Sequence, residues 1–218
     1  MMEDQARKKT WRYWRKALLS ALLGGLCGYF AGKFLAQNHT ENLFGAMSNS
    51  EYICFSLGLI YAISGLFVFL AIGFPRIGAQ LLNVQDRQEL EENRPMLFFS
   101  AWSILAMGII LILVPAAHTD GPLDNQTALV ICGVLLLMML YAHWRLNQVM
   151  DEMMKSVSME AGYIAFIMIL AFGGIWVAVA QLGYAIAPQT LDWLSMTTGF
   201  LWVASFISVA KRGMLWPR

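Results

Sequence analysis

Charged side chains are scarce in this sequence. They make up 13% of its 218 residues, while hydrophobic residues make up 58%. Average soluble proteins contain about 25% charged residues. A soluble domain so poor in charge would expose large apolar patches and aggregate. The composition therefore excludes a soluble enzyme and a disordered chain. The net charge of +1 also excludes a nucleic-acid-binding domain, which carries a large positive excess. An integral membrane protein is the class that remains.

The apolar stretches lack the groups that membrane chemistry usually requires. No carboxylate and no proline lies at the centre of any such stretch, which argues against ion-coupled carriers and broken helices. The three histidines, His39, His118 and His143, are not at ligand spacing, which argues against haem or a metal site. No nucleophile–base motif is present. We therefore predict a protein that is not an enzyme and has no cofactor or metal.

The sequence contains only three cysteines, Cys27, Cys54 and Cys132. They lie in three separate apolar stretches, with no Cys-x-x-Cys pattern. This distribution indicates small apolar packing residues, not a disulfide or a zinc site.

Apolar runs long enough to cross a bilayer are the dominant positive feature. A spanning helix needs about 20 mostly apolar residues. Six stretches approach or exceed this length: 17–37, 52–74, 96–117, 127–144, 161–184 and 193–210. The fourth and sixth are short and would need snorkelling side chains or a thinned bilayer. We predict an all-α, six-span bundle made of three helical hairpins, and an uncleaved first span.

Lysine and arginine are distributed unequally between the two sides of the predicted spans. Fourteen of the fifteen lie in segments on one side, and only Lys33 lies elsewhere. The positive-inside rule then places both termini in the cytoplasm, in a plasma (inner) membrane. The predicted organisation is a segment 1–16, a transmembrane domain 17–210 and a cytoplasmic tail 211–218.

The segment 1–16 mixes cations with amphipathic aromatic residues. Aromatic rings favour the headgroup level, and each cation near an anionic leaflet gains about 1 kcal/mol. The segment is thus a candidate interfacial lipid anchor, or an ordinary basic flank. The anchor residues are Trp11, Arg12, Trp14, Arg15 and Lys16. Lys33, near the outer end of span one, is a candidate outer-leaflet contact, by snorkelling or by pairing with Glu41 or Glu51.

A glycine zipper is predicted in the first span. Gly24, Gly28 and Gly32 are four residues apart and form a groove on one helix face, where another backbone can approach closely. The partner helix could be internal, from a second copy or from another protein. Span two, with Gly58 and Gly65, is the expected internal neighbour.

Two further patterns concern the organisation of the chain. The second and third hairpins match weakly at an offset of 65 residues, with Gly108 aligned to Gly173, which suggests a parallel duplication. The segments 86–94 and 149–160 look helical, and the second is expected to run on into span five. These segments would form a small charged platform under the bilayer, or they would simply be solvated helix ends.

The function indicated is a non-enzymatic membrane protein that packs against a partner. It would be an accessory, assembly or scaffold subunit, or a small homo-oligomer, in contact with membrane lipids and without nucleic acid. The alternative is a transporter, channel or lipid-handling protein for an apolar or amphiphilic substrate. Polar residues that could line its path are Ser56, Ser64, Ser100, Ser103, Gln181, Ser205 and Ser208. A third hypothesis is an inner-surface enzyme using Asp86, Glu89, Glu92, Asp151 or Glu152.

Overall fold

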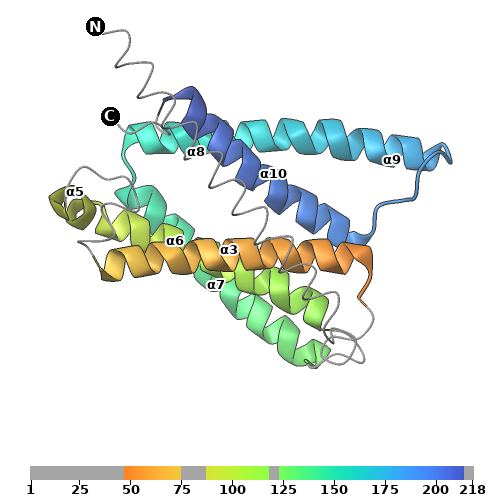
Figure 1. The fold of residues 1–218 in the computed structure, drawn as a ribbon, viewed down its shortest axis with the longest axis horizontal. Helices are drawn as coiled ribbons and strands as arrows, with labels where there is room; N and C mark the ends of the chain where they lie inside the picture. The colour runs from red at the N-terminus through yellow and green to blue at the C-terminus, as the bar shows by residue number, and fades with distance from the viewer. Residues whose placement is uncertain (1–46, 75–86, 118–122, 214–218) are drawn as a thin grey trace, which may run out of the picture. The chain divides into compact units, whose positions relative to one another are not determined.

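The structure is a computed structural model that describes residues 47–74, 87–117 and 123–213. Within these ranges the chain is helical, with no strand (Figure 1). The helices are α3 (Asn49–Gly73), α5 (Arg87–Glu92), α6 (Arg94–Ala116), α7 (Asn125–Val149), α8 (Glu152–Met168), the π-helix η1 (Ile169–Gly173), α9 (Gly174–Gln181) and α10 (Thr190–Lys211). The predicted all-α class is confirmed for this part of the chain.

Within the described residues, five helical segments are long and apolar enough to cross a membrane. They are α3, α6, α7, the continuous rod from α8 through η1 to α9, and α10. These helices fit a multi-pass membrane protein. The sixth predicted span, 17–37, the segment 1–16 and residues 214–218 of the tail lie outside the described residues. The six-span count and the orientation of the termini remain predictions.

Side-chain caps fix where several helices begin. Ser48 and Glu51 form a capping box at the start of α3, and the Asp124 carboxylate accepts hydrogen bonds from the Gln126 and Thr127 backbone N–H groups. Each cap satisfies amide groups that the first helical turn leaves without a partner. Asp124 therefore starts α7 before the apolar run begins.

The helices that contain the fourth and sixth predicted spans are longer than those spans. Helix α7 contains 25 residues and α10 contains 22, against 18 residues in each predicted span. The apolar pattern does not register the additional turns. Polar first and last turns, such as residues 145–149 of α7, continue the helix beyond the apolar run.

The segment 149–160 is divided between two helices. Helix α7 ends at Val149, Met150 is extended, and the Asp151 carboxylate accepts a hydrogen bond of 2.6 Å from the Met154 amide to begin α8. From Glu152 the helix does run on into span five, as predicted, and it ends at Gln181. In the segment 86–94, a short helix covers Arg87–Glu92, and Pro95 lies in the first turn of α6.

The long helices contact one another in the order α7, α6, α3, α10, α8. The most extensive interface joins α3 to α6, and α10 joins α3 to α8 (Figure 1). A core of Cys54, Tyr61 and Leu111 is enclosed by Leu57, Ile104, Met107, Leu191 and Leu194. The two hairpins proposed as repeats contact α3 through helices that are not equivalent. The second hairpin contacts α3 through its first helix, α6, whereas the third hairpin contacts α3 through its second helix, α10. These contacts add no support to the duplication, which stays a prediction.

Candidate functional site

The sites predicted near the N-terminus cannot be placed. Gly24, Gly28 and Gly32 lie outside the described residues. So do Lys33 and the anchor residues Trp11, Arg12, Trp14, Arg15 and Lys16. These assignments remain predictions, and the geometry below concerns other residues.

Close glycine packing does occur in the described part of the chain, between α3 and α6. A Cβ atom added to Gly108 would lie 2.8 Å from the Ala62 Cα and 2.9 Å from the Gly58 carbonyl oxygen. One added to Gly65 would lie 2.8 Å from the Leu105 amide nitrogen. At these distances each glycine position has room for a hydrogen atom but not for a Cβ atom. The small face of span two, expected to receive span one, is thus occupied by α6.

A buried hydrogen bond links α3 to α10. The Tyr61 hydroxyl donates to the Thr198 carbonyl oxygen at 2.7 Å. Nearby, the fully buried Cys54 thiol donates to the Leu111 carbonyl oxygen at 3.6 Å. Cys54 is a free thiol and packs as the sequence predicted, and Cys132 is also free and half-buried on α7.

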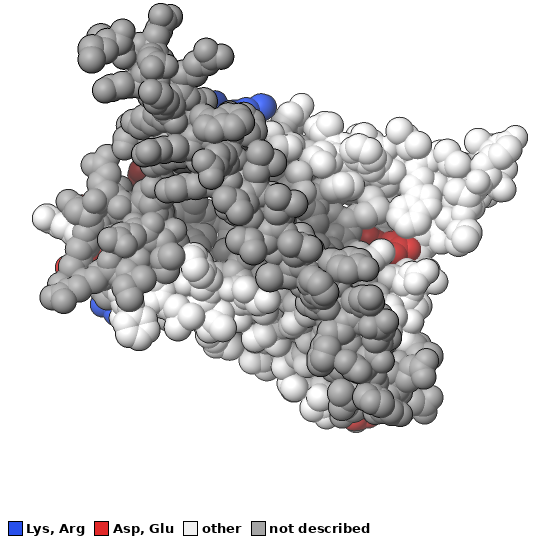
Figure 2. All heavy atoms as spheres, viewed as in Figure 1, with Lys and Arg blue, Asp and Glu red and all other residues white. Residues whose placement is uncertain are grey.

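Ionic contacts join α8 to α10 near the end of α10. The Glu160 carboxylate lies 3.2 Å from an Arg212 guanidinium nitrogen and 3.3 Å from the Lys211 amine. The buried Ser208 hydroxyl donates to the Val157 carbonyl oxygen at 3.0 Å. These ionic contacts were not predicted from the sequence, because the interacting residues lie about fifty positions apart. Charged side chains are few on the visible face of the described helices (Figure 2).

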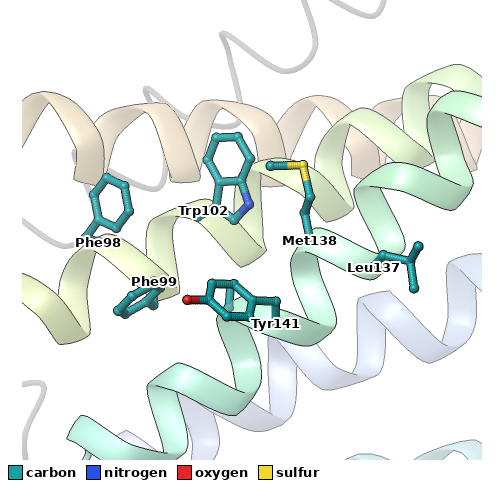
Figure 3. Close-up of a pocket in the computed structure, with 7 residues that line it drawn as sticks. Phe98, Phe99, Trp102, Leu137, Met138 and Tyr141 are labelled. Atoms are coloured by element: carbon teal, nitrogen blue, oxygen red, sulfur yellow. The ribbon is translucent and has the colours of Figure 1, made fainter.

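An apolar cavity of about 420 Å³ opens between α6 and α7. Its lining residues are Phe98, Phe99, Trp102, Leu137, Met138, Tyr141 and Ala142. Figure 3 shows the Tyr141 side chain reaching from α7 toward Phe99 on α6, with Met138 beside Trp102. The Phe98 ring also packs edge-on against Phe69 of α3, with 5.4 Å between centroids. We call this cavity the α6–α7 groove.

An arginine lies at one end of the α6–α7 groove. The Arg145 guanidinium carbon is 5.9 Å from the centre of the Phe99 ring, a cation–π geometry. One terminal nitrogen of Arg145 donates to the Gln148 side chain at 2.8 Å. Its Nε atom is enclosed and meets no acceptor among the described residues. The sequence carries one indication of this arrangement. Met138, Tyr141 and Arg145 are spaced by three and four residues, which puts all three side chains on one face of α7.

The serines proposed to line a transport path do not line this groove. The Ser64, Ser103 and Ser205 hydroxyls each donate to a carbonyl four residues earlier in their own helix. Such bonds satisfy a hydroxyl within an apolar environment. Ser56, Ser205 and Gln181 are exposed. These positions are scattered over several helices and do not form a continuous polar stripe.

Three of the acidic residues proposed for an inner-surface enzyme, Glu92, Asp151 and Glu152, make local structural contacts. Asp151 caps α8, and the Glu152 carboxylate lies 3.1 Å from the Lys155 amine. Gln88 donates to Glu92 within α5. Asp86 is outside the described residues, and the side chain of Glu89 is not described. Within the described ranges, no group of three metal-ligating side chains comes together.

Comparison with known proteins gives no relative for this chain. No family model matches it, and neither a curated protein nor a solved structure matches it significantly.

Proposed function

We propose that this chain is a non-enzymatic multi-pass membrane protein that acts by packing against another membrane protein or a second copy of itself. It would serve as an accessory, assembly or scaffold subunit. The observation that supports this most is the exposure of the outer part of span five. Helix α9 has no buried residue, and the loop after it exposes Leu182, Tyr184 and Ile186 by 71%, 84% and 87%.

The position of this loop is what distinguishes it from an ordinary lipid-facing surface. Counted from Ala161, the predicted start of span five, the 21 helical residues to Gln181 rise about 31 Å, close to the hydrocarbon thickness of about 30 Å. The non-helical apolar residues 182–187 therefore lie near the boundary of the predicted span. The Trp176 indole N–H donates to the Ile186 carbonyl at 2.9 Å, which holds the loop against the helix. Exposed apolar patches outside the hydrocarbon mark binding surfaces.

The orientation and location belong to the same proposal. The concentration of Lys and Arg on one side supports cytoplasmic termini in an inner membrane. The use of Asp151 and Glu152 in capping and pairing supports a non-catalytic role for them.

The alternative function, a transporter or lipid-handling protein, is favoured by one observation. The α6–α7 groove is apolar and falls within the range of about 300–1,000 Å³ typical of small-ligand sites. The scattered serines do not add to this alternative.

Native mass spectrometry of the full chain, extracted in mild detergent, tests the proposed function. We expect a complex of fixed stoichiometry, either with a second protein or with a second copy. Ile186→Ser should dissociate it, and Gly28→Leu should do so if the first span also contributes. Leu129→Ser is the matched control, because Leu129 is 73% exposed on α7. A monomeric wild-type chain, or equal loss with the control, would overturn the proposal.

A further inference from the structure

We propose that the α6–α7 groove, together with Arg145, binds an anionic phospholipid of the cytoplasmic leaflet. The acyl chain would lie in the groove, and the phosphate would contact the guanidinium. This inference goes beyond the proposed partner-binding function and does not depend on it. It rests on α6 and α7, whereas the partner surface is the loop after α9.

The groove itself suits an acyl chain. Its lining is mainly aromatic and aliphatic, and the side chains of Phe99 on α6 and Tyr141 on α7 approach each other from opposite helices (Figure 3). Phe98 and Leu137 are 46% and 67% exposed, so the groove opens sideways toward surrounding lipid rather than to an enclosed interior. A flexible apolar chain can enter from the bilayer without crossing a polar barrier.

Arg145 provides the charge complementarity. Its Nε–H is enclosed without an acceptor among the described residues, and an unsatisfied enclosed donor is destabilising. The side chain as a whole is partly exposed, so its terminal nitrogens are accessible to a phosphate oxygen, and guanidinium groups bind phosphates with short, charge-assisted bonds. On α8, the carboxylates Glu152 and Glu160 are paired with Lys155, Lys211 and Arg212.

A second arginine lies at the same end of the groove. Arg94 begins α6, four residues before Phe98 and eight before Trp102, so the three share one helix face. Arg145 stands in the corresponding place near the end of α7. Since α6 and α7 run in opposite directions, both arginines lie past the predicted cytoplasmic end of the apolar lining. Basic pockets between helices on that side are typical of anionic lipid headgroup sites.

Lipid retention by the full-length chain tests this site. The chain is reconstituted in nanodiscs of phosphatidylcholine with or without phosphatidylglycerol, extracted, and examined by native mass spectrometry during stepwise delipidation. We expect the wild type to retain phosphatidylglycerol in preference to phosphatidylcholine. Glycerol phosphate alone should not displace it, because the groove binds the acyl chain.

Two variants test the two parts of the site, the arginine and the apolar groove, separately. Arg145→Gln should weaken phosphatidylglycerol retention about tenfold or more, as expected for loss of a charged hydrogen bond. Leu137→Trp should obstruct the groove and lower retention while keeping both arginines. Because Leu137 is exposed, this variant tests the proposal even if Arg145→Gln does not fold. Lys155→Gln is the control that removes one cation elsewhere on α8.

Any of three results would overturn the proposed lipid site. These are unchanged phosphatidylglycerol retention in both variants, equal retention of the two lipids by the wild type, and an equal loss of retention with Lys155→Gln. So would crosslinking of a second copy or another protein through a cysteine placed at position 137.

Discussion

The interface of α3 with α6 and the surface of helix α9 are built in opposite ways. In the first, three glycines bring two backbones together so closely that a single Cβ would collide with main-chain atoms. In the second, α9 buries none of its residues, and Gly174 within it has no neighbour inside 4 Å of an added Cβ. Lipid tails are as apolar as leucine, so apolar character alone drives no association between helices. The difference indicates that small residues at complementary positions, not hydrophobicity, decide where this chain is tightly packed.

Gly108→Ala provides the strongest test of this comparison. The new methyl group would meet Ala62 and the Gly58 carbonyl, and neither backbone can move without separating the helices. We expect a loss of about 3 kcal/mol in stability, at the upper end of typical overpacking costs. The buried Cys54 thiol reports the opening, measured as its labelling rate in a Cys27→Ser/Cys132→Ser background.

Gly133→Ala is the matched control for this measurement. Gly133 lies on α7 with nothing within 4 Å of an added Cβ, so Cys54 labelling should not accelerate. Equal acceleration by both substitutions would refute the glycine contact as the cause.

Tyr61→Phe tests the link between α3 and α10. It removes the hydroxyl that donates to the Thr198 carbonyl but keeps the buried ring. We expect a loss of about 0.5–1.5 kcal/mol, since hydrogen bonds between membrane helices contribute modestly. Thermal unfolding in detergent measures the change. An unaltered midpoint would mean that ring packing alone joins α3 to α10.

Gly173→Ala should have the smallest effect. In the π-helical turn, an added Cβ would lie 2.8 Å from the Met196 terminal methyl and 3.1 Å from the Trp193 ring. A methionine side chain can move aside, and alanine also stabilises helix over glycine by about 0.5–1 kcal/mol. We expect a net change under about 1 kcal/mol in the same unfolding assay. A loss as large as that of Gly108→Ala would show that the π-helical turn is as tightly constrained as the α3–α6 interface.

The first half of the helix Glu152–Gln181 illustrates how far sequence reasoning reached. The absence of proline and glycine from residues 149–160 predicted that this segment runs on into span five, and the structure confirms this from Glu152 onward. The break at Met150 and Asp151 did not follow from apolar patterning, because a capping carboxylate makes a local hydrogen bond that hydropathy does not register. The same limitation left the polar end turns of α7 and α10 out of the predicted fourth and sixth spans.

The candidate sites divide in the same way. Two features were not predicted from the sequence: the ionic contact of Glu160 with Arg212, and the α6–α7 groove with Arg145. Each combines residues from two helices that only folding brings together. The predicted glycine zipper lies outside the described residues. The close packing that is described uses Gly58 and Gly65 as proposed, but their partner is Gly108 and its neighbours on α6.

The sequence by itself determined the class of this protein: all-helical, apolar enough for five described spans, and poor in charge within them. Local hydrogen bonding and the length of each apolar run are sufficient for that, because a helix satisfies its own backbone inside a membrane. Tertiary structure alone decided which faces meet, which glycines are indispensable and where a groove remains open. Those outcomes depend on shape complementarity between distant segments, and nearly uniform apolar surfaces leave almost no trace of it in the order of residues.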